Sequence, residues 1–267
     1  MSNRVVDLLK LKDYITITGT TLGLLSLIIS TLGGRAYISW AFFFLAFTIG
    51  TDLLDGYIAR KTKTVNEIGK QLDSLNDSLT FGIAPAFLTY LAFRTGNIYD
   101  IFIIIGSILF VLGGILRLAR FNISKTTGYT GVPTPMSGLF LLIFFYANYF
   151  YAVFESGGGS SALTHPFPII SYYVIPFLMI FLGWTNITTH IKFEKKGKSV
   201  YILFLIFAPL CPVFGIIGIL NPTQMVGIVS SIIFFGCVGI IFAYILYGLI
   251  RTLIKSNTTN KSTENPI

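Results

Sequence analysis

The sequence is dominated by apolar runs that are long enough to cross a lipid bilayer as helices. A helical span needs about 20 apolar residues, and the runs of about this length cover residues 15–33, 37–59, 68–93, 98–117, 136–154, 169–186, 199–220 and 223–250. Because lipid offers no hydrogen-bond partners to the backbone, runs of this length are stable in it as helices. We therefore predict an all-α fold, a polytopic membrane bundle of about eight transmembrane helices.

The low share of charged residues supports a lipid environment. Only 11% of the 267 residues are charged, and the mean hydropathy is +0.77, whereas a soluble domain carries about 25% charged residues. The two cysteines, Cys211 and Cys237, both lie in apolar runs. They show neither metal-ligand spacing nor the pattern of a disulfide framework, so we expect them to be small buried side chains.

The distribution of basic residues orients the predicted bundle. Of the 19 lysines and arginines, all but Arg35 and Arg94 fall in alternate segments that share one side of the membrane. The positive-inside rule places that side, with both termini, in the cytoplasm. The net charge of +8 then forms a basic rim that attracts anionic membrane lipids, and we predict no nucleic-acid partner. We expect an integral protein of the cell membrane.

Two flanking segments differ from the predicted spans. Residues 1–14 alternate apolar and charged side chains, which is the pattern either of an interfacial helix lying on the membrane surface or of a frayed terminus. Residues 255–267 are mostly polar, and we expect this tail to be disordered.

Four of the seven aspartates lie where the second predicted span ends and the third begins. Within each pair the residues are three or four positions apart, so they share one face of a helix. The link between the two spans is short, so the helices are antiparallel neighbours and their carboxylate faces can meet. Carboxylates that face one another repel unless cations lie between them or several of them are protonated, and their oxygens suit Mg²⁺, Mn²⁺ or Ca²⁺. The candidate metal ligands are Asp52, Asp55, Asp73 and Asp77.

The same two spans carry a longer pattern that resembles a known family. Its spacing, D-x2-D-G-x2-A-R-x8-G-x3-D-x3-D, is similar to the signature of the CDP-alcohol phosphatidyltransferases, and every gap matches. The matching positions are Asp52, Asp55, Gly56, Ala59, Arg60, Gly69, Asp73 and Asp77.

The resemblance implies a fold and a set of roles. It implies a six-helix core over residues 15–186, usually in a homodimer, and leaves 187–254, a basic loop and two further helices, without an assigned role. The four aspartates would hold two divalent cations, Mg²⁺ or Mn²⁺, with Ca²⁺ as a non-productive ligand. Asp77 would be the catalytic general base. The CDP group would be bound by Asp52, Gly56, Ala59, Arg60, Gly69 and Asp73.

Shorter stretches resemble the phosphatidylserine synthase branch of this family. They are GKQLDSLNDSLTFGIAPA around the last two aspartates, RLARFN at 117–122 and TGVPTP at 130–135. This resemblance implies transfer of a phosphatidyl-type group from a CDP-diradylglycerol lipid to the hydroxyl of L-serine, with release of CMP. Arginine suits two-point binding of the serine carboxylate. The candidate acceptor-binding residues are Arg117, Arg120, Asn76 and Ser78.

Other interpretations stay open. Arg117 and Arg120 could instead be cationic anchors of the cytoplasmic rim, and glycerol phosphate or inositol phosphate would also bind arginine. A membrane carrier or cation channel is a different class, in which the aspartates would line an ion path. The clustering of the aspartates near one membrane surface and the lack of paired broken spans favour the enzyme.

Overall fold

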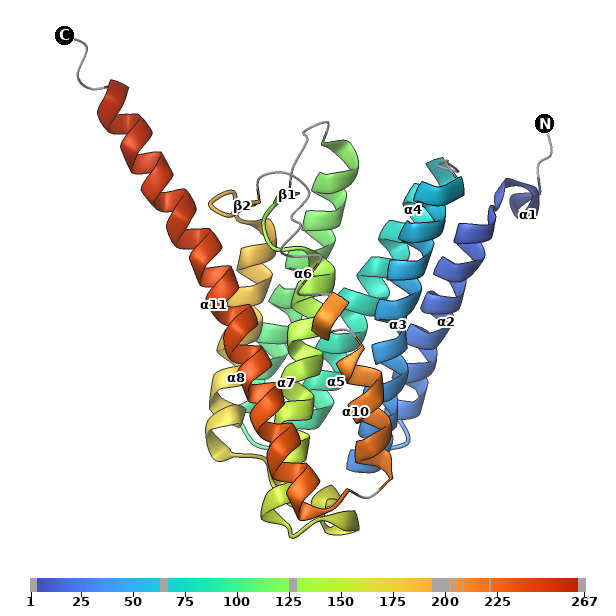
Figure 1. Cartoon of the computed structure of the whole chain (residues 1–267), viewed down its shortest axis with the longest axis vertical. Coiled ribbons are helices and arrows are strands. Elements are labelled where there is room, and N and C mark those ends of the chain that lie inside the picture. Colours follow the sequence, from blue (N-terminus) through green and yellow to red (C-terminus); the bar gives the residue numbers. More distant parts are fainter. Residues whose placement is uncertain are drawn as a thin grey trace.

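The computed structural model describes residues 4–62, 67–124, 129–193, 202, 205–207, 209–220 and 222–263, and this part of the chain is almost entirely helical (Figure 1). The N-terminal half contains α1 (Val5–Leu8), α2 (Leu11–Ser30), α3 (Gly34–Thr62), α4 (Glu67–Asp77), the π-helical stretch η1 (Ser78–Ile83), α5 (Ala84–Phe93) and α6 (Asp100–Ile123). The C-terminal half contains β1 (Tyr129–Thr130), α7 (Thr134–Glu155), the 3-10 helix η2 (Gly159–Leu163), α8 (Ile169–Ile187), β2 (Lys192–Phe193), α10 (Leu210–Ile219) and α11 (Gln224–Thr263).

Among the described residues, six helices are long and apolar enough to cross a membrane. They are α2, α3, α6, α7, α8 and α11 up to Thr252, which agrees with the predicted helical membrane bundle. The third predicted span, 68–93, falls on α4, η1 and α5, which follow one another without a gap. The seventh, 199–220, falls on α10 and on residues that lie partly outside the described ranges. The total of eight spans therefore stays a prediction.

In both flanking segments the structure describes helix. α2 begins at Leu11, inside the segment expected to be interfacial, and this places Lys12 and Asp13 in the bundle, where both are buried. At the other end of the chain α11 continues to Thr263. Residues 255–263, which the sequence predicts to be disordered, are therefore helical, and the last four residues lie outside the described part.

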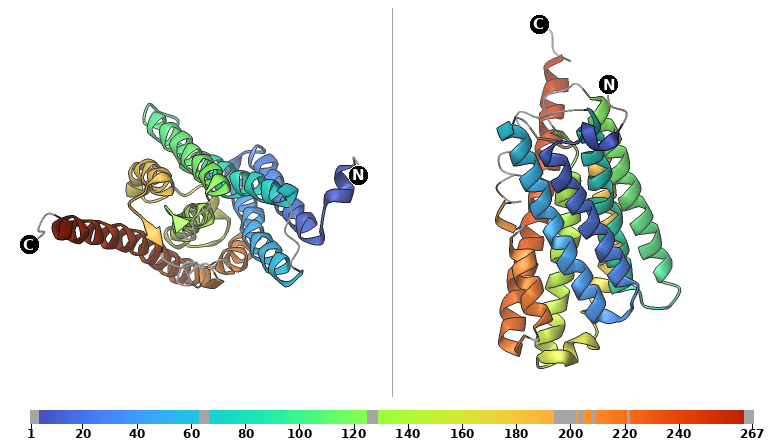
Figure 2. Two further views of the ribbon diagram at one scale, coloured as in Figure 1. Left: turned by 90° about the horizontal axis from the view of Figure 1, so that it is seen from above. Right: turned by 90° about the vertical axis from the view of Figure 1, so that its right-hand side faces the viewer.

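Helix α7 forms the axis of the bundle. Seen from above, it is enclosed by the other helices (Figure 2, left), and it is buried along nearly its whole length. Its aromatic rings carry much of the packing: Phe145 stacks on Phe42 of α3, with ring centroids 3.9 Å apart, and Phe150 stacks on Phe234 of α11 at 6.0 Å. Such ring pairs stabilise the packing beyond the burial of their area, and they fix α3 relative to the centre.

Helices α6 and α8 pack backbone against backbone. A Cβ atom on Gly113 of α6 would lie only 2.2 Å from the carbonyl oxygen of Gly183 on α8. Small residues permit this close approach between membrane helices. The contact sets the relative position of the α6 end that carries Arg117 and Arg120.

The helix that follows Asp77 changes its winding. In η1 the N–H of Ala84 bonds to the carbonyl of Leu79, five residues back. Pro85 has no N–H to give to the carbonyl of Phe81, so the α-helical bonding pattern is interrupted here. π-helical stretches are frequent at functional sites, and this one begins directly after Asp77.

A two-stranded antiparallel sheet joins the segment before α7 to the segment after α8. β1 pairs with β2. Beyond β1, the N–H of Gly131 donates to the carbonyl of Ile191 at 2.9 Å, and the N–H of Val132 donates to the carbonyl of Thr185 at 2.9 Å. The TGVPTP segment is thereby tied to the end of α8.

Candidate functional site

Three carboxylates meet at one end of the bundle, which we call the acidic end. Asp52 and Asp55 lie on α3 and Asp73 lies on α4, and one oxygen of each lies within 4.8 Å of the others. The acidic end is at the top of Figure 1, on the same side as α1 and the C-terminal part of α11. Asp55 is buried, and the other two are partly exposed. The structure thus brings these three predicted ligands together.

Asp77, the last residue of α4, lies beside this cluster but outside the group of three whose oxygens approach within 4.8 Å. It is 9% exposed, and among the described residues its Oδ1 atom has no hydrogen-bond partner. It interacts electrostatically with the other three aspartates and with Arg117. A buried polar atom without a partner is costly, so this oxygen is a natural ligand atom or proton acceptor.

The first turns of α2 add two threonines that the sequence analysis did not include in the site. The hydroxyl of Thr16 donates to Oδ2 of Asp55 at 2.7 Å, and the hydroxyl of Thr20 donates to Oδ1 of Asn76 at 2.9 Å. The two threonines are four positions apart, so they share a helix face. The sequence feature that could have revealed them is the four-residue spacing of these polar side chains within an otherwise apolar run.

A buried ion pair lies beside the cluster. Nζ of Lys12 lies 2.6 Å from Oδ1 of Asp13, whose other oxygen accepts the N–H of Lys10 at 2.8 Å. Lys12 also acts electrostatically on Asp55 and Asp73. A buried charge needs a partner of opposite sign, and Asp13 is that partner for Lys12; at Asp73 the electrostatic effect of Asp13 opposes that of Lys12.

The donor set of the cluster fits divalent cations. The potential ligand atoms found together in the described ranges are carboxylate oxygens, which Mg²⁺ and Mn²⁺ prefer over nitrogen or sulfur. Oδ1 of Asp77 adds a buried oxygen with its bonding capacity unused. Asp52, Asp55, Asp73 and Asp77 are therefore the residues that would hold metal.

The residues predicted to line the CDP group lie on the same two helices. A Cβ atom at Gly56 would meet only Nη1 of Arg60 within 4 Å, at 3.5 Å, so there is open space directly beside Asp55. Arg60 is exposed, Ala59 is partly exposed, and Gly69 of α4 is buried. The open space at Gly56 is what a bound ligand next to the carboxylates would need.

Two of the four residues predicted to bind the acceptor lie at the cluster. Arg117 is buried, donates from Nη1 to the hydroxyl of Thr134 at 3.0 Å, and interacts electrostatically with Asp77. Asn76 is 1% exposed, and its Nδ2 has no partner in the described part of the chain. Both side chains are therefore buried near Asp77, and their role in acceptor binding stays a prediction.

The other two predicted acceptor residues are engaged within the protein. The hydroxyl of Ser78 donates to the carbonyl of Ser74 at 2.7 Å. The guanidinium of Arg120 donates to backbone carbonyl groups near the end of α8. Their role in acceptor binding stays a prediction.

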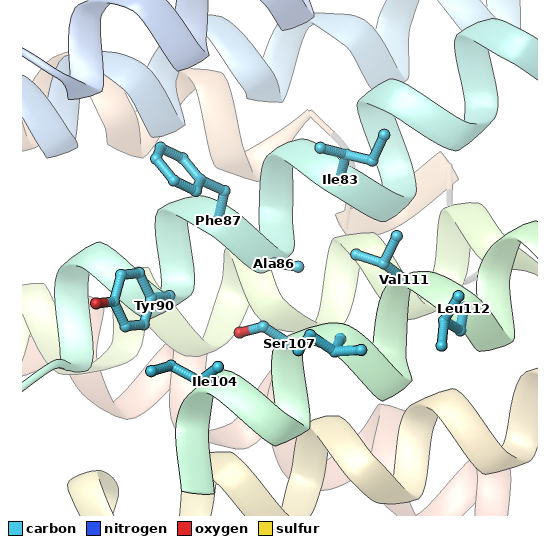
Figure 3. A pocket seen from close by; sticks show the side chains of 9 residues that line it. Ile83, Ala86, Phe87, Tyr90, Ile104, Ser107, Val111 and Leu112 are labelled. Atoms are coloured by element: carbon cyan, nitrogen blue, oxygen red, sulfur yellow. The ribbon is translucent and has the colours of Figure 1, made fainter. Parts of the chain in front are cut away.

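An apolar groove runs between η1–α5 and α6. It has a volume of about 410 Å³, and its lining includes Ile83, Phe87, Val111 and Leu112 (Figure 3). The hydroxyl of Ser107, one of its few polar groups, is already donated to a backbone carbonyl of its own helix. This lining suits hydrocarbon and offers no charged group to a substrate.

The opposite end of the bundle, which we call the far end, holds a second cavity. Its volume is about 740 Å³, and its lining includes Arg94, Asp100 and His165. Arg35 also lies here and donates to the carbonyl groups of Ala162, at 2.8 Å, and of His165. None of the four clustered aspartates lines this cavity.

The fold and the site together define a class of membrane enzyme. The profile of the CDP-alcohol phosphatidyltransferase family matches residues 10–235, a range that contains the whole aspartate cluster. The chain therefore belongs to the CDP-alcohol phosphatidyltransferase family. It is an integral membrane enzyme, and its family depends on divalent metal ions.

Curated proteins that are similar to this chain carry closely related names. CDP-diacylglycerol–serine O-phosphatidyltransferase of Methanocaldococcus jannaschii is 31% identical over 225 residues, which cover 84% of this chain and 92% of that protein. Archaetidylserine synthase of Methanothermobacter thermautotrophicus is 33% identical over 154 residues, 55% of this chain and 62% of that protein. CDP-diacylglycerol–serine O-phosphatidyltransferase of Helicobacter pylori is 30% identical over 205 residues, 75% of this chain and 74% of that protein.

Proposed function

We propose that the chain transfers a phosphatidyl-type group from a CDP-diradylglycerol lipid to the hydroxyl of L-serine and releases CMP. The observation that carries this proposal is the buried carboxylate of Asp77, which lies among three further aspartates and interacts with Arg117. The names of the three relatives, each of which refers to serine, support serine as the acceptor.

The acidic end binds the CDP group. Its four aspartates would hold two divalent ions, Mg²⁺ or Mn²⁺, and Ca²⁺ would bind there without supporting the reaction. Such ions neutralise the charge that builds on phosphate oxygens during phosphoryl-type transfer. The open space at Gly56 takes the cytidine side, together with Ala59 and Gly69. Arg60 lies at the rim, where its guanidinium can reach a phosphate oxygen.

Asp77 acts as the general base. It accepts the proton of the serine hydroxyl as that oxygen forms a bond to the phosphorus that carries the lipid. The bond between this phosphorus and the bridging oxygen breaks, and CMP leaves with the electron pair. Oδ1 of Asp77 has no partner within the described residues, so it is available to take the proton. Holding both reactants in this geometry supplies much of the remaining rate.

Arg117 binds the carboxylate of serine. It is buried, so its charge is screened less than at the surface, and a guanidinium grips a carboxylate at two points. Arg117→Lys is expected to raise the KM for serine about tenfold, because lysine cannot form the two-point contact. The KM for the CDP lipid should stay unchanged. Steady-state rates of CMP release measure both constants, and an equal rise in both would contradict a serine-specific role.

The membrane arrangement is part of the same proposal. The third of eight spans comprises α4, η1 and α5, the seventh includes α10, and both termini and the acidic end face the cytoplasm of a cell membrane. The excess of basic residues at the acidic end supports this orientation, and a homodimer is expected. A membrane-impermeant maleimide added outside cells should label Asn97→Cys at the far end but not Ser124→Cys. The reverse labelling would refute the orientation.

The acceptor is tested with purified protein. CMP release from a CDP lipid is followed with Mg²⁺ or Mn²⁺, with serine, glycerol 3-phosphate and inositol phosphate supplied in parallel. Release that needs both metal and serine supports the proposal. If only a phosphorylated acceptor supports release, the proposed transfer reaction stands, but serine is not the acceptor. No release with any acceptor, despite bound metal, would favour a carrier or channel.

A further inference from the structure

Arg120 makes a set of hydrogen bonds that its place in the sequence does not reveal. It lies three residues after Arg117 on α6, so the sequence presents the two arginines as a pair. Nη1 of Arg120 donates to the carbonyl of Ile187 at 2.7 Å. Nη2 donates to the carbonyl of Thr130 at 2.7 Å and to that of Asn186 at 3.3 Å. All three acceptors are backbone groups.

These bonds cap the C-terminal end of α8. The last four carbonyl groups of a helix have no partner inside it, and they form the negative end of the helix dipole. Arg120 supplies donors to two of them, those of Asn186 and Ile187, and the N–H of Val132 supplies one to Thr185. Removing the guanidinium would leave these carbonyl groups without a donor, which is costly where they are buried.

The same bonds prevent Arg120 from gripping a carboxylate at two points. A guanidinium does so through two adjacent nitrogens, either Nη1 with Nη2 or Nε with Nη2. Nη2 carries two hydrogens, and both are given to the carbonyl groups of Thr130 and Asn186. Both two-point faces are therefore occupied by the backbone.

The segment that Arg120 holds leads directly to the acceptor site. Residues 130–134 run along the end of α8, and the hydroxyl of Thr134 accepts the hydrogen bond from Nη1 of Arg117 at 3.0 Å. The fit is close: Gly131 has a φ of +81°, and a Cβ atom there would lie 2.2 Å from the carbonyl oxygen of Asn186. A shift of this segment would therefore move the partner of Arg117.

We propose that Arg120 is a positioning residue of the acceptor site and not an acceptor ligand. By capping α8 it fixes the segment 130–134, and through Thr134 it fixes the guanidinium of Arg117. This inference rests on the proposed function, in which Arg117 binds the carboxylate of serine.

A double-mutant cycle on the KM for serine tests the inference. Arg120→Lys keeps the charge but loses the branched donor set, and Thr134→Val removes the hydroxyl at nearly constant shape. Each change alone is expected to raise the KM for serine about tenfold, since a misplacement of about 1 Å can cost up to a hundredfold. The KM for serine of the double variant should be only slightly higher than that of the more impaired single variant, because both changes act through one contact. The KM for the CDP lipid should stay at the wild-type value.

Arg35→Lys is the matched control. Arg35 also gives its guanidinium to backbone carbonyl groups, those of Ala162 and His165, but at the far end. The KM for serine of the Arg35→Lys variant should equal that of the wild type, even if the variant is less stable to heat. Arg120→Gln is a second way to weaken the cap, since a side-chain amide still donates to a carbonyl group, and it serves if Arg120→Lys does not fold.

Several outcomes would overturn the inference. If the effects of Arg120→Lys and Thr134→Val on the KM for serine multiply, Arg120 does not act through Thr134, and the proposed positioning route is refuted. Wild-type KM values in both Arg120 variants, or an equal rise in the KM for the CDP lipid, would also refute positioning of the acceptor site. If wild-type protein uses only a phosphorylated acceptor, the proposed function fails, and the same cycle on the KM of that acceptor still decides the role of Arg120.

Discussion

The acidic end and the far end both carry aspartates, but the protein satisfies them differently. At the far end the carboxylate of Asp100 accepts the N–H of Thr95 at 2.7 Å and the N–H of Gly96 at 2.8 Å. At the acidic end, Oδ1 of Asp77 and Nδ2 of Asn76 are buried with no partner in the described part of the chain. Polar groups that the protein satisfies itself shape the fold, whereas buried groups left unsatisfied are available to a ligand.

The largest difference between the ends is expected when an aspartate loses its charge. Asp77→Asn keeps the shape of the side chain but removes the base, so turnover should fall by about a hundredfold to ten-thousandfold, while binding of the CDP lipid is largely kept. Rates of CMP release and direct binding of the CDP lipid measure the two effects. Asp100→Asn at the far end is the control and should keep wild-type turnover. Near-normal turnover of Asp77→Asn would mean that Asp77 is not the base.

A smaller effect is expected from a residue that only orients a metal ligand. The hydroxyl of Thr16 donates to Asp55, and losing such a partner typically costs ten- to a hundredfold in metal affinity or activity. Thr16→Val should therefore raise the half-saturating metal concentration by about that factor in a titration of CMP release. Thr21→Val is the matched control, because the Thr21 hydroxyl is exposed and donates to a carbonyl of its own helix. Unchanged metal dependence of Thr16→Val would show that this bond does not orient Asp55.

The aspartate cluster could be predicted from the sequence because its signal is local. Residues three or four positions apart share a helix face, and a short link brings consecutive helices together. These two facts predict the approach of Asp52 and Asp55 to Asp73, and run length predicts the membrane helices. The interruption at η1 has a local cause too, since Pro85 lacks an N–H, but sequence analysis predicted an unbroken span there.

The hydrogen bonds that surround the cluster could not be predicted because their partners are distant in sequence. Thr16 and Asp55 are 39 positions apart, and Arg120 and Ile187 are 67 positions apart. The pattern of one helix shows which face is polar but not which distant segment packs on that face. Arg117 and Arg120 are therefore equivalent in sequence, and only the packing of α8 and the segment before α7 distinguishes their contacts.

The two ends should also respond in opposite ways to added side-chain volume. At the acidic end Gly56 adjoins open space, so Gly56→Leu should fold but occupy the room of the CDP group and raise the KM for the CDP lipid about tenfold. At the far end Gly158 has a φ of +98°, and a Cβ atom there would lie 2.9 Å from the backbone nitrogen of Gln224. Gly158→Ala should lower the free energy of unfolding by about 1–3 kcal/mol and leave the KM unchanged. Steady-state kinetics and thermal inactivation are measured on both variants. A destabilised Gly56→Leu with a normal KM, or a stable Gly158→Ala with a raised KM, would contradict this difference between the two ends.

The smallest effect is expected from the satisfied carboxylate of the far end. Asp100 lies in the first turn of α6 and accepts the N–H and the hydroxyl of Thr95 as well as the N–H of Gly96. Losing a side-chain acceptor at a helix start typically costs about 1 kcal/mol, so Asp100→Ala should lower stability by about that amount. Since no substrate group is bound at this end in the proposed reaction, turnover and both KM values should stay at wild-type levels. Thermal inactivation and CMP release are measured on the same preparation. A loss of turnover without a loss of stability would show that the far end takes part in catalysis, and the division between the two ends would have to be abandoned.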